Sequence, residues 1–492
     1  VYIKRSGAVT TGASSQNLAD AGDILIEGKT ILHQGAAQAN SIGGQSGHVT
    51  FMAKDTLTLS SASRTLAQGG ATDVSHGGTI IGLASNLTAG QVQVEAGAVL
   101  DVRGGAAGGH GGELLLGDRR GAPAGLDTVP FIGTASAGFQ TGRFRLIPAD
   151  LTLTSSFDLG GLGPLQDVSL VALNNITVTT PDSLLDLANF ASGVPNARLR
   201  LVAGNDLKFQ DAHIQNGQFF ELGLGTVLAR ELVGVAGNNV TLGSLPAPFR
   251  TFDSRASTIV MGDGGSLSLT ARNGNISLID PVEGFLSSLH VRGGGNLTLT
   301  AQKDIITGLR IAHEFEEDLL QQVPVVDSTL QGILVDGTMV TGADGSRTGS
   351  GKLTIVSKEG SLLGGRVAGL NRSPGFMVRN ADATVSVKGT LGSSSFALDA
   401  NGLLPDGARI YELANPAKGS NGQFLTPPIV EDRSGYLDIA MTNAHVSLEA
   451  ESHVFFKGAK DSKLLWERDS TPSKSANSIT EWANGEVLPP QR

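Results

Sequence analysis

Apolar and polar residues alternate strictly along residues 265–279 of the chain. Leu267, Leu269 and Ala271 are separated by small polar residues, a short polar corner follows, and the alternation resumes at Ile276. A period of two predicts β-strands that bury one face. Because the corner is too short for a helix, the stretch predicts two short strands joined by a bend.

The same pattern recurs through the chain as apolar-x-apolar-x-Ala, a polar corner and apolar-x-apolar. Copies or looser versions occupy residues 49–59, 168–178, 199–209, 296–306, 353–363 and 437–448. One such unit cannot bury its apolar face alone, whereas stacked copies bury a continuous core. The repeats therefore predict an all-β solenoid, a single parallel β-helix over residues 1–459.

Several segments interrupt the repeats. We expect insertions from the solenoid near residues 118–150, 182–195, 310–323 and 401–434. The first is a looser loop and the last is an irregular, proline-containing excursion. After Phe456 the pattern stops, so residues 460–492 are predicted to form a cap, a linker or a segment that docks on another chain.

Two of these insertions are predicted to be short helices. In 182–195, Asp182 can cap the helix, and Gly193 before Pro195 ends it. In 310–323, apolar residues recur every four positions from Ile311 to Val323. Acidic residues fill the first turns of this second segment, where the helix dipole favours them.

Composition agrees with a narrow solenoid core. Of 492 residues, 67 are Gly, 17% are charged and only 5% are aromatic, which suits many tight corners and a core of Val, Leu, Ile and Ala. The net charge of −10 disfavours nucleic-acid binding, which needs basic patches. There is no Cys, and no apolar run is long enough for a transmembrane helix. The chain begins at Val1 without a signal segment, so we expect a piece of a longer chain.

Residues that could carry chemistry are scattered. His313 and Glu317 could share a helix face, but two ligands make a weak metal site. The glycine run 103–112 is not followed by Lys-Ser/Thr, as a phosphate-binding loop would be. The candidate carboxylates in the repeats are Asp206, Asp211, Asp280, Glu283 and Asp304. None of them forms an Asp-x-Asp pair on a strand. The isolated Asp-Gly corners at 263–265 and 344–346 are a weak calcium signal. We therefore expect no catalytic residues, no metal site and no cofactor.

Asparagine recurs at the corners in the pattern Asn-x-Thr/Ser. The sequons are Asn86, Asn175, Asn239, Asn275, Asn296 and Asn371. On one interpretation the pattern is geometric, since Asn tolerates tight corners and aligned Asn residues can form hydrogen-bonded ladders. On the other, these residues are glycosylation sites on a secreted surface. The position at the start of a strand favours the geometric interpretation.

The repeats at 265–278 and 295–306, together with residues 98–117, resemble those of the filamentous haemagglutinin family, the large secreted adhesins of the two-partner route. The resemblance covers about two thirds of the chain. It implies a right-handed parallel β-helix, an extracellular or bacterial cell-surface location, and adhesion or matrix building. The secretion domain of that family, with its Asn-Pro-Asn motifs, is not visible in this sequence.

From these observations we expect a structural or adhesive extracellular protein, part of a surface fibre or adhesin stalk. The expected partners are neighbouring copies or other parts of a longer chain, joined end to end, with surface glycans or host proteins as ligands and an outer-membrane transporter during export. The sequence leaves two alternatives open, which are a polysaccharide-degrading β-helix enzyme and a non-catalytic glycan-binding passenger.

Overall fold

β-strands are the only regular secondary structure in the part of the chain that the structure, a computed structural model, describes. The described residues are 1–121, 123, 131–135, 138–154, 165–180, 185–186, 197–216, 231–243, 257–262, 264–279, 286–311, 330–341, 347–367, 370–372, 374–392, 437–442, 444–452, 454–455, 478–483 and 487–488. The chain divides into two compact units. Unit 1 comprises Val1–Asn238 and Met261–Ser268, and unit 2 comprises Asn239–Val260 and Leu269–Arg492.

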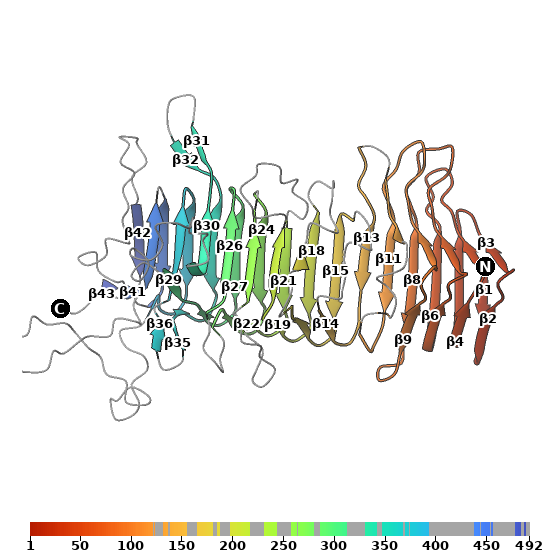
Figure 1. The fold of residues 1–492 in the computed structure, drawn as a ribbon, viewed down its shortest axis with the longest axis horizontal. Coiled ribbons are helices and arrows are strands. Elements are labelled where there is room, and N and C mark those ends of the chain that lie inside the picture. Colours follow the sequence, from red (N-terminus) through yellow and green to blue (C-terminus); the bar gives the residue numbers. More distant parts are fainter. Residues whose placement is uncertain are drawn as a thin grey trace, which may run out of the picture. The chain divides into compact units, whose positions relative to one another are not determined.

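Unit 1 is built on one long parallel sheet (Figure 1). Its strands are β1 (Tyr2–Lys4), β2 (Ala8–Thr11), β4 (Asp23–His33), β6 (His48–Leu59), β8 (Thr79–Ala84), β9 (Gln91–Val94), β11 (Glu113–Gly117), β13 (Arg143–Leu146), β15 (Asp167–Ala172), β18 (Arg198–Ala203) and β21 (Glu231–Ala236). β1 and β2 pair with β4, β4 pairs with β6, and β6 pairs with β8 and β9. From β8 onward the pairing runs through β11, β13, β15, β18 and β21.

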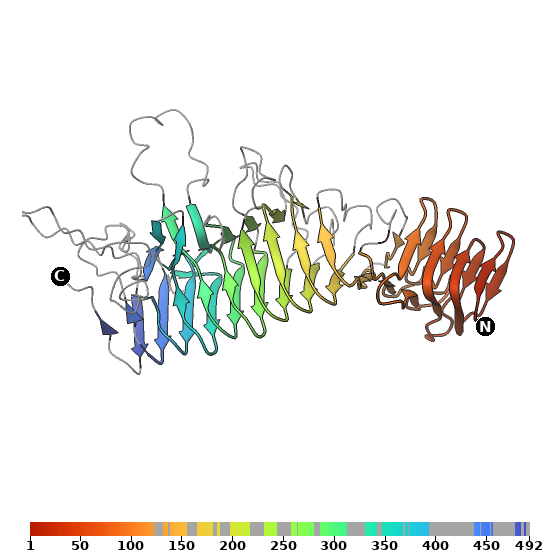
Figure 2. The same cartoon turned by 90° about the horizontal axis from the view of Figure 1, so that it is seen from below.

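Three smaller parallel sheets complete the coils of unit 1. The first contains β3 (Gln16–Leu18), β5 (Ala36–Gln38), β7 (Arg64–Leu66), β10 (Val99–Asp101) and β12 (Phe131–Ile132). The second contains β14 (Leu151–Leu153), β16 (Ile176–Val178) and β19 (Leu207–Gln210), and the third pairs β17 (Leu185–Asp186) with β20 (His213–Asn216). Each strand therefore lies on the strand one coil earlier, and Figure 2 shows this stacking from below.

Unit 2 repeats the arrangement. One sheet contains β27 (Asn296–Ala301), β33 (Lys352–Ser357), β38 (Asp382–Val387), β40 (His445–Ala450) and β42 (Ser478–Ala483). A second contains β22 (Val240–Gly243), β25 (Ile276–Ser277), β28 (Ile305–Ile306) and β34 (Leu362–Leu363). A third contains β26 (Ser288–Arg292), β30 (Leu330–Asp336), β37 (Gly375–Arg379) and β39 (Asp438–Thr442), and β41 (Val454–Phe455) pairs with β43 (Val487–Leu488). Strands β23 (Thr258–Met261) and β24 (Ser266–Ala271) contain residues of both units.

Among the described residues, antiparallel pairs of strands occur in side hairpins of unit 2, and isolated antiparallel bridges join Ile42 to Gln45 and Gly105 to Gly108 in unit 1. The hairpin pairs are β29 (Leu309–Ile311) with β30, β31 (Met339–Thr341) with β32 (Arg347–Gly349), and β35 (Gly365–Val367) with β36 (Leu370–Arg372). Figure 1 shows β31 and β32 projecting from the stack. The other strand pairs among the described residues are parallel, and the register of β4 with β6 shifts once, between Gly28 and Thr30. The predicted all-β parallel β-helix is therefore confirmed.

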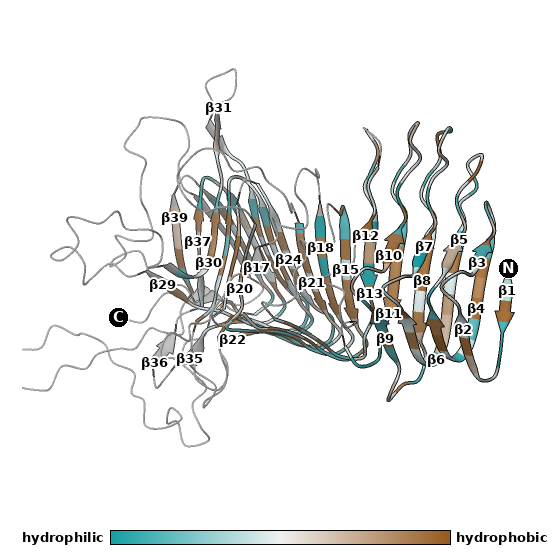
Figure 3. Cartoon of the chain, turned by 45° about the vertical axis from the view of Figure 1, so that its right-hand side comes forward, coloured by the Kyte–Doolittle hydropathy of each residue, from teal (hydrophilic) through white to brown (hydrophobic). Residues whose placement is uncertain are grey.

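The period-two pattern accounts for the core. In β18 and β27, alternate residues ending in Ala are buried, and the residues between them are half-buried or exposed. Figure 3 shows apolar and polar positions alternating along the strands. Paired strands are aligned so that buried positions lie on buried positions. Leu199 therefore lies on Val168 in unit 1, and Leu297 lies on Leu353 in unit 2. Complete burial of one such aliphatic side chain contributes roughly 1.5–3 kcal/mol.

One large side chain in the core of unit 1, that of Phe51, is matched by a glycine in the next coil. Phe51 of β6 is fully buried, and its register partner in β8 is Gly82. A Cβ atom at Gly82 would lie 3.0 Å from methyl groups of Leu57 and Leu116, so no wider residue fits without repacking. Stacking of large apolar residues is therefore interrupted at this one position, where Gly82 lies on Phe51.

The two predicted helices are wrong wherever the structure describes them. Leu185–Asp186 in the first segment form β17, and Arg310 and Ile311 in the second belong to β29. The remaining residues of 182–195 and 310–323 lie outside the described residues, as does all of 401–434. At both places hydrogen bonding to a neighbouring strand prevails over the local helical periodicity, since tertiary pairing overrides propensity.

Two other predicted interruptions contain strands of the stack. Segment 118–150, expected to be a loop, includes β12, which pairs with β10, and β13, which pairs with β11 and β15. Tail 460–492 includes β42 and β43, which pair with β40 and β41. Each of these strands contains only two or three apolar residues, too few to separate a strand from a loop by sequence.

A buried histidine lies at the end of β4. His33 is fully buried, its Nδ1 lies 2.7 Å from Oγ1 of Thr11, and its ring centroid lies 4.9 Å from that of Phe51. Burial lowers the pKa of His33 from 6.5 to about 4, and a hydrogen bond with the backbone of Arg64 opposes this shift. The imidazole is therefore neutral in the folded state at neutral pH.

We predict that His33 makes unit 1 less stable in acid. Between pH 6.5 and pH 4 the unfolded chain binds a proton that the folded chain does not, so stability falls as the pH falls through this window. The expected loss at pH 4.5 is roughly 2–3 kcal/mol. Urea denaturation at pH 7 and pH 4.5, followed by hydrogen exchange of the β4 and β6 amides, measures it.

His33→Gln is the matched variant, because its amide can still bond to Thr11 but does not titrate. We expect its pH slope to be shallower than that of the natural chain. Burial raises the pKa of Asp118 in the same unit, which acts in the opposite direction, but this contribution is common to both proteins. Equal slopes would show that His33 does not control acid stability.

Candidate functional site

A row of polar side chains lies at the ends of β3, β5, β7 and β10 in unit 1. Oδ1 of Asp20 accepts hydrogen bonds from Nε2 of Gln38 at 3.3 Å and from the backbone N–H of Asn40 at 3.1 Å. Oδ1 of Asn40 accepts the N–H of Gln68 at 3.2 Å. Nε2 of Gln68 donates to Oδ2 of Asp101 at 2.8 Å. Each coil is thus bonded to the next through one side chain, and we call this row the corner ladder.

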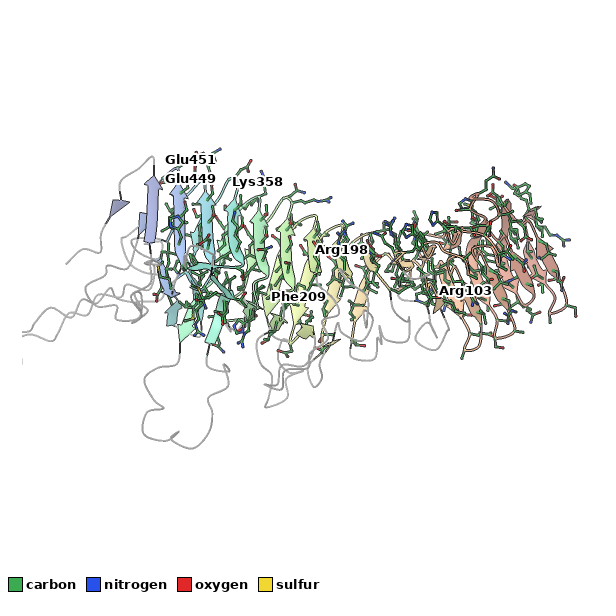
Figure 4. The ribbon with its side chains drawn as sticks, turned by 90° about the horizontal axis from the view of Figure 1, so that it is seen from above. Arg103, Arg198, Phe209, Lys358, Glu449 and Glu451 are labelled. Carbon is green, nitrogen blue, oxygen red and sulfur yellow. The ribbon has the colours of Figure 1, made fainter. Side chains whose placement is uncertain are left out.

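The corner ladder ends on an ion pair. Asp101 is 1% exposed and accepts the Nε of Arg103 at 2.9 Å, a second bond from Nη2, and the backbone N–H of Arg103 at 3.1 Å. The hydrogen bond to Asp101 raises the pKa of Arg103. The pair neutralises the buried carboxylate, while 47% of the Arg103 side chain remains exposed. Arg103 is labelled in Figure 4.

Backbone pairing holds the ladder residues in line. Beyond the strand ends, Ser41 N–H donates to Gln68 O, Gly69 N–H to Arg103 O, and Gly104 N–H to Thr134 O. The parallel register of the strands therefore continues into the corners. As a result, residues that are 28–33 positions apart in sequence lie on successive coils.

A groove of about 620 Å³ lies beside the corner ladder, within unit 1. Asp20, Asn40, Gln68, Arg103 and Thr134 contribute polar lining together with the buried Ser41, and glycine and alanine residues with Ile42 contribute the rest. Its volume is in the range of sites that bind small organic ligands. We call this cavity the ladder groove.

Three aromatic rings are stacked in the loops that lead from these corners back to the long sheet, before β8, β11 and β13. The rings of His76 and His110 are stacked with centroids 4.7 Å apart, and Phe139 meets His110 edge-on at 5.1 Å. Nδ1 of His76 accepts the N–H of His110, and Nδ1 of His110 accepts the N–H of Gln140. Because both Nδ1 atoms are acceptors, the ring protons are on Nε2. The stack joins three coils and leaves no Nδ1 lone pair for a metal.

A second ladder runs through the asparagine corners. In unit 1, Oδ1 of Asp150 accepts the N–H and Nδ2 of Asn175, and Oδ1 of Asn175 accepts the N–H of Asp206 at 3.2 Å. Hydrogen bonds, the largest from the Asn174 side chain, lower the pKa of Asp150. These contacts show the hydrogen-bonded arrangement that the geometric interpretation of the sequons predicts.

The same ladder motif is present in unit 2. Oδ1 of Asn239 accepts the N–H of Asn275 at 3.0 Å, and Oδ1 of Asn275 accepts the N–H of Asp304 at 2.9 Å. Oδ1 of Asp304 accepts the N–H of Ser361, and Oγ of Ser361 accepts the N–H of Thr390. Asn, Asp and Ser thus occupy one structural position, since each offers an oxygen to the next corner.

The other sequon residues differ. Asn86 donates its Nδ2 to Asp55, and its Oδ1 accepts the N–H of Thr88, so it forms an Asx turn. Asn296 is exposed at the start of β27, and Asn371 lies in β36. Glycosylation of any of the six stays a prediction.

The residues singled out for chemistry do not converge where the structure describes them. Asp206 and Asp304 belong to the asparagine ladders, in different units, and Asp211 is buried at a corner after β19. His313, Glu317, Asp280 and Glu283, like Asp263 and Asp344, lie outside the described residues. Within the described ranges no three His, Cys, Asp or Glu side chains are grouped so as to hold a metal ion.

Sequence reasoning missed the corner ladder and its groove. Asp20, Asn40 and Gln68 come two residues after a strand, whereas Asp101 is the last residue of β10, and the intervals and residue types differ as well. The available signal was the polar residue at the end of each short strand. It becomes informative only when the coil boundaries are known.

The fold and its stacked corners define a parallel β-helix protein. Comparisons with models of protein families, with curated proteins and with solved structures each gave no match for this chain. The resemblance to the filamentous haemagglutinin family therefore stays a prediction. The described residues also contain no helix that is long and apolar enough to cross a membrane.

We predict that the asparagine ladder stabilises unit 2. Asn275→Ala removes the acceptor of the Asp304 N–H in a half-buried corner, and we expect a loss of about 1–2 kcal/mol. Asn275→Asp keeps an acceptor oxygen and should recover most of that stability. Urea denaturation and hydrogen exchange at Asp304 measure both variants. Arg272→Ala, an exposed change in the same corner, is the control, and an equal effect there would contradict the prediction.

Proposed function

We propose that the chain is a structural or adhesive part of an extracellular fibre or adhesin stalk on a bacterial surface. The observation that carries this proposal is the in-register parallel stacking of coils in both units. Such stacking gives a repeating body whose length grows with the number of coils. Its coils are joined without disulfide bonds, since the chain has no Cys.

We propose that the stacked coils act as a stiff spacer. Within each unit, described coils are bonded to the next by backbone hydrogen bonds, by a buried apolar stack and by side-chain ladders at corners. Bending or sliding one coil would break all three at once, because a register shift of one residue turns the apolar face outward. This supports a role in holding a contact surface away from the cell.

Contact surfaces would lie on the corners and side hairpins. Loops carry binding functions more often than the scaffold that supports them, and here β31–β32 leave the stack in Figure 1. In unit 1 the ladder groove gives a second such surface. Surface glycans and host proteins are the ligand classes that this function needs.

A polysaccharide-degrading enzyme is the alternative function. That activity needs carboxylates that converge in a cleft with perturbed pKa values. In the part of the chain that is described, the ladder groove contains one exposed carboxylate, that of Asp20. No observation favours the enzyme over the stalk.

Immuno-electron microscopy of the source bacterium tests the proposed location. We expect an antibody against the folded chain to label filaments or a layer at the cell surface. Brief protease treatment of intact cells should remove the label, because the antigen would be accessible from outside. Label confined to the cell interior, protected until the cells are lysed, would contradict the proposal.

End-to-end contact is the proposed mode of assembly. Strands β1, β2 and β3 pair on one side only, with β4 and β5, so their outer edge offers unpaired backbone groups. Leu18 of β3 is 53% exposed at this edge. Another coil, from further chain or from a second copy, would cover both features.

We predict that Leu18→Lys weakens self-association of the chain. Light scattering and sedimentation velocity over a concentration series should show assembly of the natural chain and a shift towards monomer in the variant. Leu87→Lys is the control, since Leu87 is 73% exposed in the turn after β8 and lies away from the edge. A natural chain that stays monomeric at high concentration would count against end-to-end contact.

A further inference from the structure

The ladder groove presents a regular set of polar atoms that its internal bonds leave unused. The internal bonds use Oδ1 of Asp20, Oδ1 of Asn40 and Nε2 of Gln68. Oδ2 of Asp20, Nδ2 of Asn40 and Oε1 of Gln68 remain for a ligand, as does Nη1 of Arg103. Acceptors and donors therefore alternate from coil to coil along the groove.

We propose that the ladder groove binds a neutral oligosaccharide. A sugar hydroxyl both donates and accepts hydrogen bonds, so a row of hydroxyls can satisfy alternating acceptors and donors. The proposal rests on the extracellular adhesive role proposed above and names the class of ligand for it. It assigns the contact to five side chains, those of Asp20, Asn40, Gln68, Arg103 and Thr134.

The charge of the groove favours a neutral ligand. Arg103 is paired with the buried carboxylate of Asp101, so the remaining charged side chain in the lining is the exposed Asp20. A polyanion would meet one repelling carboxylate and no unpaired cation. A polycation would find only one counter-charge. Hydroxyl groups carry no such penalty, and they bond to charged and neutral partners alike.

The shape of the groove also suits sugar rings. Gly69, Gly70 and Gly104 line it together with the small Ala106 and the apolar Ile42. Ile42 is 54% exposed, so its apolar surface is available to the C–H face of a ring. Binding sites for small molecules combine such apolar walls with a few polar groups.

An extended peptide fits less well for two reasons. Peptide residues repeat every 3.3 Å or so, whereas neighbouring coils lie about 4.8 Å apart, so the two rows fall out of step. Peptides also bind by adding a strand to a sheet edge. The backbone N–H groups of Asn40, Ser41, Gly69, Gly104 and Ala106 are already bonded within the corners. No free edge is therefore offered in the groove.

Calorimetric titration of the full chain tests the proposal. The probes are neutral hexasaccharides (maltohexaose, cellohexaose, laminarihexaose and mannohexaose), with hexagalacturonate as the polyanion and a ten-residue Gly-Ser-Thr peptide as comparators. We expect at least one neutral hexasaccharide to bind with a micromolar to millimolar Kd and both comparators to bind at least about tenfold more weakly.

Two variants place the binding in the groove. Ala106→Trp fills the groove from an exposed position without touching the corner ladder, and we expect it to abolish binding. Asn40→Asp keeps the oxygen that accepts the Gln68 N–H but replaces the free donor, and we expect about a tenfold weaker Kd. Ala107→Trp is the control, because Ala107 is the next exposed residue and does not line the groove; its Kd should be unchanged. Circular dichroism confirms that each variant is folded.

Three results would overturn the proposal. They are no binding of any neutral hexasaccharide, binding that Ala106→Trp leaves unchanged, and binding of the peptide or polyanion that Ala106→Trp abolishes. Each can occur whether or not the chain forms surface fibres, because the titration uses the purified protein. Failure of the surface-labelling experiment would in turn leave a measured affinity intact, so the two proposals fail independently.

Discussion

Parallel, in-register hydrogen bonding between successive coils is the constraint on which the rest of the structure depends. It places each residue on a residue of the coil before, so Leu199 lies on Val168 and Asn275 follows Asn239. Apolar positions then form continuous buried columns, and polar corner positions form ladders. Because the side-chain period along a strand is two, a slip of one residue would exchange the buried and exposed faces. The stack therefore admits one register.

This constraint also explains how polar groups are tolerated at and below the surface of the coils. Asp101 is buried, and its charge is matched by Arg103 and by Gln68 from the neighbouring coil. His33 is buried as a neutral ring beside Thr11. A buried polar group left without a partner is costly. In a coil stack the partner comes from the next coil, and one polar residue at a corner favours another above it.

The fold could be predicted from residues such as Leu267, Leu269 and Ala271, because period-two alternation depends only on local geometry. The strands in the two segments that were predicted as helices could not be found in this way. Residues 185–186 and 310–311 pair with strands that are distant in sequence. Strand β13 was not predicted either, because its four residues lie between glycine- and proline-rich stretches and are too few to show the alternation of a strand.

The candidate site was predicted in part. The asparagine ladder followed from repeated sequons, whereas the ladder groove is made from unlike residues at unequal intervals.

The sequence by itself determined the strand pattern, the buried face of each repeat and the positions of the polar corners. These properties follow from the spacing of apolar residues within about ten positions. Only the tertiary structure decided which corners lie on one another, and hence that Asp20, Asn40, Gln68 and Arg103 line one groove. The physical reason is that corner loops differ in length from coil to coil. Hydrogen bonds between coils set the alignment of these loops. The spacing of residues along the sequence does not indicate which hydrogen bonds will form.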